Sequence, residues 1–500
     1  MEQPTAIDLN ATTLDALPDS VTTPTYDRTA VTTGIVHFGV GGFHRAHQAM
    51  YVDRLLERGD GDGWGICGVG VMSSDRAMRD VMERQNGLYT LTLEHPDGSR
   101  ETRAIGSIVD YLYAPDDPEA VIERLASEAT RIVSLTITEG GYNFSHTTGE
   151  FLPETPDVAH DLEEGSAPRT VFGLVTAALR RRLDRDVPPF TIMSCDNIQA
   201  NGEVARAMFT AYAKLKDPEV AAMLESDVSF PNSMVDRITP ETTDELRASV
   251  RERTGVADAW PVVAEPFCQW VLEDSFTLGR PPYEHAGVQV VDDVEPYELM
   301  KLRLLNASHQ GLCYFAYLAG YRLVHDAARD PLFADFLLAY MDDEATPTLQ
   351  AVPGVDLGEY KATLIERFSN PGVRDTVPRL CAESSDRIPK WLLPVVRDQL
   401  DQDRPVRLSA AIVASWARYA EGVDEQGQPI EVVDRLADTL VPIARHQREE
   451  PTAFLANRSV FGDLVDDPRF VEPYVQTLAA LHSVGARATL EGLMEARGGA

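Results

Sequence analysis

Cysteine is scarce in this chain, and its few copies are scattered. The 500 residues include five cysteines, an odd number without a CxxC pair. Disulfide frameworks and cysteine-ligated zinc sites both need cysteines in paired or closely spaced positions. We therefore expect no disulfides and no metal centre.

Long apolar runs are missing as well. The most apolar stretches, such as residues 311–318, fall short of the ~18 residues that a membrane-spanning helix needs. The first residues, Met1-Glu2-Gln3-Pro4, have neither the basic nor the apolar region of a secretion signal. We expect a cytoplasmic protein that does not associate with membranes.

Positive charge is also in short supply. The 45 Lys and Arg residues stand against 79 Asp and Glu residues, which gives a formal net charge of −34. Such a charge repels nucleic acid, so we expect no nucleic-acid partner. Lysine is the rarer of the two cations, with only five positions: Lys214, Lys216, Lys301, Lys361 and Lys390.

The first half of the chain carries an α/β pattern. From Gly34 to about Gln289, short β-rich runs alternate with longer helical patterns, as in a parallel sheet covered by helices on both faces. We predict strands at 35–38, 64–71, 88–93, 132–137, 190–193 and 288–291, and helices that include 45–57, 171–183 and 203–214. This half is typical of a Rossmann-like, doubly wound domain.

The second half changes character after Pro296. Apolar residues recur at helical spacing in residues 299–323, 332–341, 360–368, 391–402 and 409–419, with almost no strand signal. We expect two domains: a dinucleotide-binding domain at residues 1–295, whose first 33 residues form an arm laid over the fold, and a mainly α-helical substrate and catalytic domain at residues 296–500.

The first chemical motif is Gly39-Val40-Gly41-Gly42-Phe43-His44-Arg45, between an apolar strand and a helical pattern. Glycines at such a turn let a pyrophosphate approach the backbone at the helix N-terminus. The fingerprint is incomplete, because His44 stands where GxGxxG has its third glycine, so an ordinary strand-to-helix turn is an equal alternative. If the turn binds a dinucleotide, then Gly39, Gly41, Gly42 and Phe43 line its site.

Asp75 follows the second predicted strand. An acidic residue at this place accepts hydrogen bonds from the adenosine ribose and repels a 2′-phosphate, which predicts NAD rather than NADP. Two alternatives stay open. Asp75 could instead cap the helix that begins at Arg76, and the charge of Arg76 could partly neutralise the discrimination.

The most informative stretch is Lys301-Leu302-Arg303-Leu304-Leu305-Asn306-Ala307-Ser308-His309. At about 100° per residue, Lys301, Asn306 and His309 fall within an arc of about 140° on one helix, so all three can face one cleft. A satisfied hydrogen-bond network would explain any one of them alone. A lysine, however, is a costly way to fill a buried position.

Alcohol oxidation gives these residues a chemical reason. As hydride leaves a secondary carbon, the hydroxyl proton must go to a base. Burial can lower the pKa of a lysine by several units, so that its amine is unprotonated near neutral pH and can accept this proton without zinc. The forming alkoxide needs hydrogen-bond donors. Asn306 suits that role, and so does Asn197, which follows the predicted strand at 190–193.

Six ordered motifs carry a resemblance to a known family over nearly the whole chain. They are GVGGFHRAHQA from Gly39, TITEGGY from Thr136, SCDN from Ser194, FPNSMVDRITP from Phe230, AEPFCQWVLED from Ala264 and PYELMKLRLLNASH from Pro296. With these motifs the chain resembles the polyol-specific long-chain dehydrogenase/reductase family, whose members are similar to mannitol 2-dehydrogenase. The resemblance implies that Lys301 is the catalytic base, that Asn197 and Asn306 anchor the reacting oxygen, and that His309 orients the substrate.

The resemblance also implies roles outside this group. Asp236 would contact substrate hydroxyls, and Glu298 would pass the proton towards solvent unless it is only a helix N-terminal charge. The substrate-reading segment from Arg379 to Pro389 matches less well. Arg379 agrees with the family, whereas Arg387 replaces a lysine, which changes the hydrogen-bond geometry. We expect both arginines to bind substrate.

The resulting hypothesis is zinc-independent, NAD-dependent and reversible oxidation of mannitol to fructose. Within the family, the alternatives are reduction of a keto-uronate such as fructuronate, which would suit Arg379 and Arg387, and oxidation of arabinitol or sorbitol. From other classes, we weigh a non-catalytic NAD-binding sugar sensor and a zinc alcohol dehydrogenase. Lys301 argues against the sensor, and the lack of a Cys/His ligand set argues against zinc. Nothing in the second half requires a large partner surface, so we expect a monomer.

Overall fold

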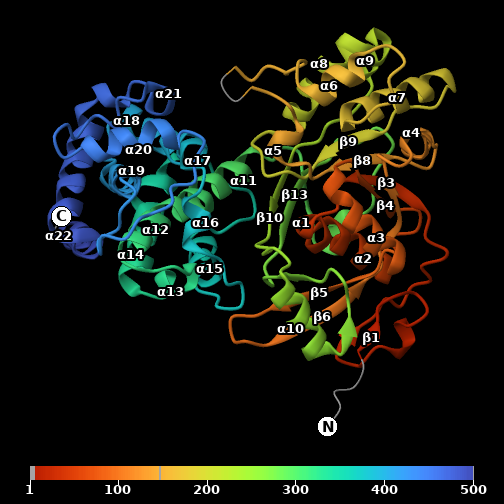
Figure 1. Ribbon diagram of the computed structural model, residues 1–500, viewed down its shortest axis with the longest axis horizontal. Coiled ribbons are helices and arrows are strands. Elements are labelled where there is room, and N and C mark those ends of the chain that lie inside the picture. The colour runs from red at the N-terminus through yellow and green to blue at the C-terminus, as the bar shows by residue number, and fades with distance from the viewer. Residues whose placement is uncertain (1–5, 146–147, 499–500) are drawn as a thin grey trace. The chain divides into compact units, whose positions relative to one another are not determined.

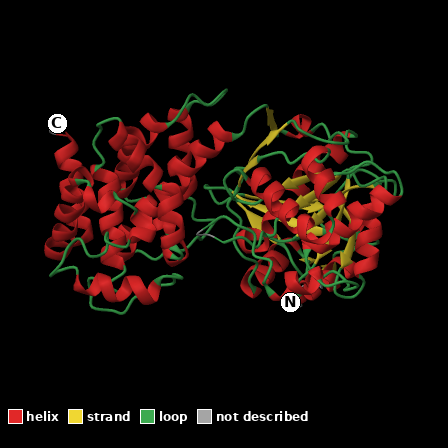
Figure 2. Cartoon of the chain, turned by 90° about the horizontal axis from the view of Figure 1, so that it is seen from above, coloured by secondary structure: helices red, strands yellow, loops and turns green. Residues whose placement is uncertain are grey.

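The computed structural model describes residues 6–145 and 148–498. The chain forms two compact units, Met1–His95 with Ser99–Glu295 and Pro96–Gly98 with Pro296–Ala500. Among the described residues, all the β-strands except isolated bridges belong to the first unit (Figure 2). Within the same residues, no helix is both long and apolar enough to cross a bilayer.

A parallel sheet forms the centre of the first unit. Its order is β7-β4-β3-β8-β9, with β3 at Thr33–Phe38, β4 at Gly65–Gly70, β7 at Ile108–Tyr113, β8 at Ile132–Leu135 and β9 at Thr191–Ser194. In chain order this sheet runs third, second, first, fourth, fifth, which is the Rossmann arrangement. The strand order reverses between β3 and β8, and ligands of such sheets bind in the crevice beyond the carboxyl ends at that point. The predicted α/β fold class is confirmed.

Helices cover both faces of this sheet (Figure 1). Side chains alternate along β3, so Val36 and Phe38 enter one core with Val175 of α7, while Ile35 enters the other core with Val52 of α2. The helices of this unit are α1 at Gly42–Ala46, α2 at Gln48–Arg58, α3 at Arg76–Arg84, α4 at Pro118–Ala126, α5 at Thr138–Gly141, α6 at Pro156–Leu162, α7 at Val171–Asp184, α8 at Asn201–Lys216, α9 at Pro218–Ser226 and α10 at Asp244–Thr254, with 3-10 turns at Leu14–Ala16, Ser73–Asp75 and Tyr283–Ala286.

Three smaller sheets complete the first unit. Their orders are β12-β5-β6-β2, β10-β13-β14 and β1-β11. The strands are β1 at Ile7–Asp8, β2 at Val21–Thr22, β5 at Tyr89–Glu94, β6 at Arg100–Ile105, β10 at Ser233–Asp236, β11 at Val256–Ala257, β12 at Val262–Ala264, β13 at Gln269–Glu273 and β14 at Gln289–Val291.

Some strand predictions therefore need correction. The run at 88–93 does form a strand, β5, but it pairs antiparallel with β6 outside the central sheet. The run at 288–291 likewise forms β14, next to β13. Several strands of the smaller sheets were not predicted, among them β6, β10, β12 and β13. In the central sheet the strand that was not predicted is β7, which lies at the edge and has mostly half-buried residues. An edge strand needs no continuous apolar run, so the apolar pattern of the sequence did not indicate β7.

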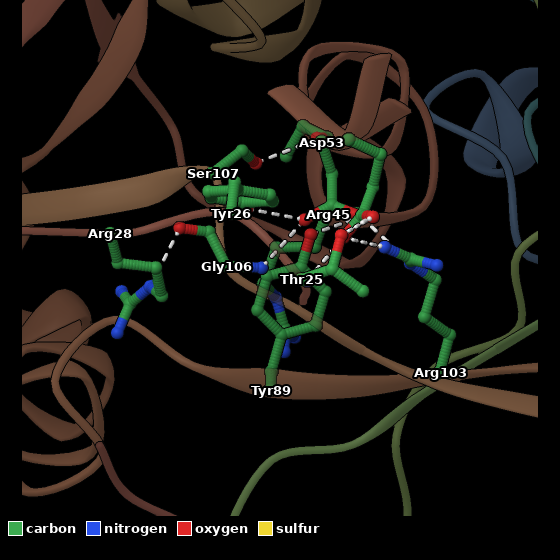
Figure 3. A network of polar contacts seen from close by, with 11 residues as sticks. Thr25, Tyr26, Arg28, Arg45, Asp53, Tyr89, Arg103, Gly106 and Ser107 are labelled. Carbon is green, nitrogen blue, oxygen red and sulfur yellow. Dashed lines mark hydrogen bonds and ion pairs between the residues drawn. The ribbon is translucent and has the colours of Figure 1, made fainter. Parts of the chain in front are cut away.

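The segment before β3 is tied to the first unit by a polar network (Figure 3). The Tyr26 hydroxyl donates to Asp53 Oδ1 at 2.6 Å, and Arg103 Nε donates to Asp53 Oδ2 at 2.8 Å. The Thr25 hydroxyl donates to Glu57 Oε2 at 2.6 Å. Since Asp53 and Glu57 both belong to α2, this helix anchors the N-terminal segment near strand β6, which carries Arg103.

The second unit is built from helices and loops. Two of them, α12 and α19, are buried along almost their whole length and pack against each other. Helices that are apolar all round belong in the core of a helical domain. The helices are α11 at Glu295–Met300, α12 at Ala307–Leu318, α13 at Val324–Ala328, α14 at Pro331–Tyr340, α15 at Leu357–Phe368, α16 at Val377–Cys381, α17 at Ser384–Trp391, α18 at Leu393–Asp401, α19 at Arg407–Tyr419, α20 at Ala437–His446, α21 at Arg458–Phe461 and α22 at Pro468–Gly498, with 3-10 turns at Thr346–Thr348 and Leu464–Asp466.

Two predicted helices are interrupted. The helix predicted at 45–57 breaks at His47, whose ψ of −96° separates α1 from α2. The helix predicted at 299–323 contains a π-helical turn, η4, at Lys301–Asn306 between α11 and α12. A second π turn, η5, spans Met341–Ala345. Single π turns inside α-helices are rare and occur frequently at functional sites.

Candidate active site

A cavity of about 810 Å³ opens at the carboxyl ends of the central strands. Its wall includes Gly39 after β3, Val71 after β4 and Thr136 after β8. The other side of the cavity is formed by α6 and the start of α7. The cavity thus lies at the point where the strand order reverses, and its volume is in the range of small-molecule and cofactor sites.

The glycine-rich turn after β3 borders this cavity. Gly39 has a φ of +91°, and a Cβ there would stand 2.0 Å from the Thr136 carbonyl oxygen, so the fold itself requires this glycine. A Cβ on Gly41 or Gly42 would meet no neighbour closer than 3.9 or 3.5 Å, respectively. Neither packing nor backbone conformation explains these two glycines, which favours the close approach of a ligand.

His44, in the place of the third glycine, is fully buried beneath the turn. Its ring stacks on His37, with 3.4 Å between the ring centroids. His37 Nδ1 hydrogen-bonds the Ser134 hydroxyl at 2.8 Å, and Nε2 hydrogen-bonds the Thr136 hydroxyl at 2.9 Å. Burial lowers the pKa of His37 to about 3, so the ring is neutral. His37 and His44 therefore support the turn from below, a role that the sequence motif did not reveal.

Phe43 and Asp75 continue the same region. Phe43 stacks on His47 with 4.9 Å between ring centroids. Asp75 lines the cavity, and its Oδ2 accepts hydrogen bonds from the amides of Val71 and Met72, both at 2.9 Å. The alternative that Asp75 caps the helix beginning at Arg76 is wrong, because its side chain makes no capping bond to α3.

Arg76 is occupied elsewhere. Its Nη2 donates to Asp116 Oδ1 at 2.8 Å, and its guanidinium lies over the Tyr113 ring at 5.1 Å from the centroid. The charge of Arg76 is therefore balanced by Asp116, which weakens the idea that it offsets Asp75.

Asn197 and Asp236 lie on neighbouring segments of the first unit. Asn197 follows β9 and is exposed, whereas Asp236 ends β10 and is buried. Asn201 joins the two segments, since its Nδ2 donates to the Asp196 carbonyl at 2.9 Å and to the Ser233 carbonyl at 2.8 Å. This buried asparagine at the start of α8 fixes the loop that carries Asn197 beside the strand that carries Asp236.

In the second unit, the π turn η4 begins at Lys301 and ends at Asn306. The Ala307 amide donates to the Leu302 carbonyl, five residues earlier, instead of four. The α-helical arc of about 140° that we expected is therefore wrong, because a wider turn changes the angle per residue. Lys301 is 6% exposed and Asn306 5%. Within the described residues, the buried Oδ1 of Asn306 has no hydrogen-bond partner.

His309 belongs to the next turn, in α12, and Glu298 to the last turn of α11. Both side chains are buried, at 9% and 6% exposure. The His309 ring packs on Phe368 at the end of α15, with 4.5 Å between ring centroids. The second unit thus carries Glu298, Lys301, Asn306 and His309 on three consecutive helical elements.

The two arginines of the substrate-reading segment are both engaged. Arg379 Nε donates to Asp375 Oδ1 at 2.6 Å, and its Nη2 pairs with Asp375 Oδ2. Arg387 Nη1 donates to the carbonyls of Arg379 and Leu380 at 3.1 and 3.0 Å, near the end of α16. Arg387 therefore holds the backbone next to Arg379, while the charge of Arg379 is paired.

No metal cluster accompanies these residues. Within residues 6–145 and 148–498, no group of three or more His, Cys, Asp or Glu side chains is arranged to hold a metal ion. The five cysteines are free thiols.

Comparison with protein-family models gives two matches. The model of the mannitol dehydrogenase Rossmann domain matches residues 33–285, and that of the mannitol dehydrogenase C-terminal domain matches residues 293–482. Together they cover most of the chain.

Individual relatives agree along nearly the full length. The chain is 46% identical to mannitol 2-dehydrogenase of Phaeosphaeria nodorum over 98% of this chain and 86% of that protein, and 45% identical to a mannitol dehydrogenase of Saccharomyces cerevisiae over 99% of both. A solved ternary complex of Pseudomonas fluorescens mannitol 2-dehydrogenase with NAD and D-mannitol has 44% identity and a TM-score of 0.88, covering 98% of this chain and 100% of that one. A substrate-free D-sorbitol dehydrogenase has 40% identity and a TM-score of 0.90, covering 96% and 100%. The chain belongs to the mannitol dehydrogenase family.

Proposed function

We propose that this protein is a zinc-independent, NAD-dependent polyol dehydrogenase that oxidises mannitol reversibly to fructose. The observation that carries the proposal is the π turn η4, which begins with a buried lysine and ends with a buried asparagine whose Oδ1 has no partner among the described residues. A buried acceptor without a hydrogen-bond partner is costly unless a polar ligand completes the site. A sugar alcohol supplies such hydroxyl groups.

The cofactor site in this proposal is the cavity at the carboxyl ends of the central strands. Gly41 and Gly42 leave room for a pyrophosphate beside the turn, Phe43 flanks it, and Gly39 keeps the turn tight. Asp75 lines this cavity, its Oδ2 is bonded to the turn after β4, and its carboxylate would accept hydrogen bonds from the adenosine ribose, which favours NAD over NADP. When bound, NAD supplies the hydride acceptor.

Lys301 acts as the general base. It accepts the proton of the secondary hydroxyl at Nζ, and the side-chain amides of Asn306 and Asn197 hold the reacting oxygen as negative charge develops on it. His309 orients the substrate, and Glu298 passes the proton onwards from Lys301.

The remaining hydroxyl groups of the polyol are bound by Asp236 and Arg379. A carboxylate accepts hydrogen bonds from hydroxyl groups, and a guanidinium donates to their oxygen atoms. Arg387 supports Arg379 through the backbone carbonyl that it bonds.

Sorbitol is the second candidate substrate. The solved D-sorbitol dehydrogenase has 40% identity to this chain and a TM-score of 0.90. The structure makes reduction of a keto-uronate less favoured than the sequence alone suggested. Asp375 already balances the charge of Arg379, and two backbone carbonyls accept hydrogen bonds from Arg387.

We further propose that the enzyme works as a soluble monomer in the cytoplasm. Free thiols at all five cysteines suit a reducing compartment. Size-exclusion chromatography with light scattering measures the mass in solution, which is 55.1 kDa for a monomer.

A substrate panel tests the proposed function. The purified protein is assayed for NADH formation with NAD and mannitol, sorbitol or arabinitol, for NADH consumption with fructose or fructuronate, and with NADP in place of NAD. We expect mannitol and fructose to give the highest kcat/KM, NAD to exceed NADP, and a chelator to leave the rates unchanged. A protein that is inert with every polyol and keto-sugar contradicts the proposal.

A further inference from the structure

Asp375 lies two residues before α16 and belongs to none of the sequence motifs. Arg379 Nε donates to its Oδ1 at 2.6 Å, and Arg379 Nη2 pairs with its Oδ2. Such a two-point contact fixes the plane of a guanidinium as well as its position. The Arg379 side chain is nevertheless 57% exposed, while the Asp375 side chain is only 10% exposed. The carboxylate is thus buried behind an arginine that still faces outward.

Asp375 is itself held in place by the backbone. Its Oδ1 accepts from the Thr376 amide at 2.8 Å, and its carbonyl accepts from the Val324 amide at 3.0 Å. Burial alone would raise the pKa of Asp375, but hydrogen bonds and the charge of Arg379, with a further contribution from His309, hold this pKa below its usual value. Asp375 is therefore ionised at neutral pH.

The ion pair is close to the candidate site of the second unit. α16 packs against α12, and Gln310 Nε2 in α12 donates to the Leu380 carbonyl at 3.4 Å. Gln310 directly follows His309, and Leu380 directly follows Arg379. In addition, α17 packs against the π turn η4, which carries Lys301 and Asn306. Asp375 therefore interacts electrostatically with His309 and is bonded to Arg379 of the substrate-reading segment.

The charge balance of this pair distinguishes two classes of substrate. A polyol or keto-sugar is neutral, and it needs only hydrogen-bond donors in a fixed geometry, which the paired guanidinium still offers through its remaining N–H groups. A sugar acid brings a carboxylate, which would gain little from an arginine already neutralised and would be repelled by Asp375. The same arginine without its partner would be a good carboxylate site.

We propose that Asp375 is a positioning and specificity-determining residue: it aligns Arg379 for the hydroxyl groups of neutral substrates and excludes substrates that carry a carboxylate. This inference rests on the proposed function, because it assumes that Arg379 contacts the substrate. Asp375 itself acts through Arg379 and does not touch the reacting carbon.

The test is the variant Asp375→Asn, which keeps the shape of the side chain and removes its charge. We measure kcat and KM for NADH-dependent reduction of fructose and of fructuronate. In the variant we expect the ratio of kcat/KM for fructuronate to that for fructose to rise at least about tenfold. Most of this change should appear in KM, with KM for fructuronate lower and KM for fructose higher. A merely structural role would lower both activities together.

A matched control is available in the same unit. Asp467 forms a two-point pair with Arg469, at 3.1 and 2.6 Å, and its Oδ1 also accepts from a backbone amide, as that of Asp375 does. This pair is not part of the proposed machinery. Asp467→Asn should leave the substrate ratio unchanged.

A second measurement covers the case in which Asp375→Asn does not fold. In the wild-type enzyme, mannonate, which carries a carboxylate in place of a terminal hydroxymethyl group, should compete with mannitol at a Ki at least about tenfold above the KM of mannitol. Equal affinity for the two overturns the inference.

The outcomes separate the inference from the proposed function. If the wild type reduces fructose and the folded variant gains no preference for fructuronate, the inference is wrong and the proposed function stands. If the wild type is inert with all neutral substrates, the proposed function is wrong, and this inference fails with it.

Discussion

Lys301 is a lysine in a chain that nearly always uses arginine as its cation. The distinction matters for a base, because arginine stays protonated in proteins whereas a buried lysine can give up its proton. Burial at 6% exposure at the start of a π turn fits such a role. Another buried cation of the second unit, Arg303, has a different role. Arg303, two residues later, is paired with Asp398 at 2.6 Å.

Replacing Lys301 tests its role as a base. Lys301→Met keeps much of the apolar stem and removes the amine, so we expect kcat for mannitol oxidation to fall by about 10²–10⁴-fold. NADH affinity, measured by fluorescence titration, should stay near the wild-type value because the cofactor cavity belongs to the first unit.

The control for this variant is Lys214→Met, at an exposed lysine paired with Glu225. It should leave kcat unchanged. Near-normal turnover in Lys301→Met would remove lysine from the mechanism.

At the scale of elements, the glycine turn after β3 combines two kinds of glycine. Gly39 is needed by the fold, because its φ is +91° and a Cβ would collide with the Thr136 carbonyl. Gly41 has an ordinary backbone conformation and free space around a Cβ. The two positions therefore separate stability from ligand binding.

We predict different effects for alanine at these two positions. Gly39→Ala should lower both the melting temperature and the affinity for NADH, because the turn cannot keep its shape. Gly41→Ala should keep the melting temperature within about 1 °C and weaken NADH binding at least about tenfold, since the methyl group occupies the approach of the pyrophosphate. Thermal unfolding and NADH titration measure both. Unchanged NADH affinity in Gly41→Ala would contradict the assignment of the cofactor site.

Elements also show how far the sequence could predict the structure. The strands with continuous apolar runs, such as β3 and β8, were predictable because they are buried on both faces. The edge strand β7 was not, because half-buried positions give no such run. The π turn was not predictable either, since a helical pattern assumes a constant angle per residue. The long helix α22 also escaped prediction, and it is kinked at Gly485, where φ is +84°.

The sequence suggested candidate site residues, but not the residues that hold them in place. Polar residues within apolar helices stand out in a sequence, as Lys301 and Asn306 do. Asp375 and Asn201 do not stand out in the sequence. Asp375 acts by pairing with the side chain of Arg379, and Asn201 by bonding a backbone carbonyl that is distant in the chain. Only the folded structure places them next to the residues that they orient.

For the whole molecule, family membership and composition both favour a small neutral substrate. The net charge of −34 disfavours anionic macromolecules as partners, and a neutral sugar alcohol is unaffected by it. The first unit offers a cavity at the carboxyl edge of a Rossmann sheet, and the second carries the buried Lys301 and Asn306, which we propose as base and hydrogen-bonding group. In the proposed function, hydride leaves a secondary carbon of a polyol.

Isotope transfer tests that claim most directly. Mannitol carrying deuterium on its symmetry-equivalent carbons C2 and C5 is incubated with the enzyme, NAD and a chelator, and the products are analysed by mass spectrometry and NMR. We predict NADH that carries one deuterium at the nicotinamide C4, together with fructose that retains the other. NADH without deuterium, or an aldose formed by oxidation of a terminal carbon, would contradict the account.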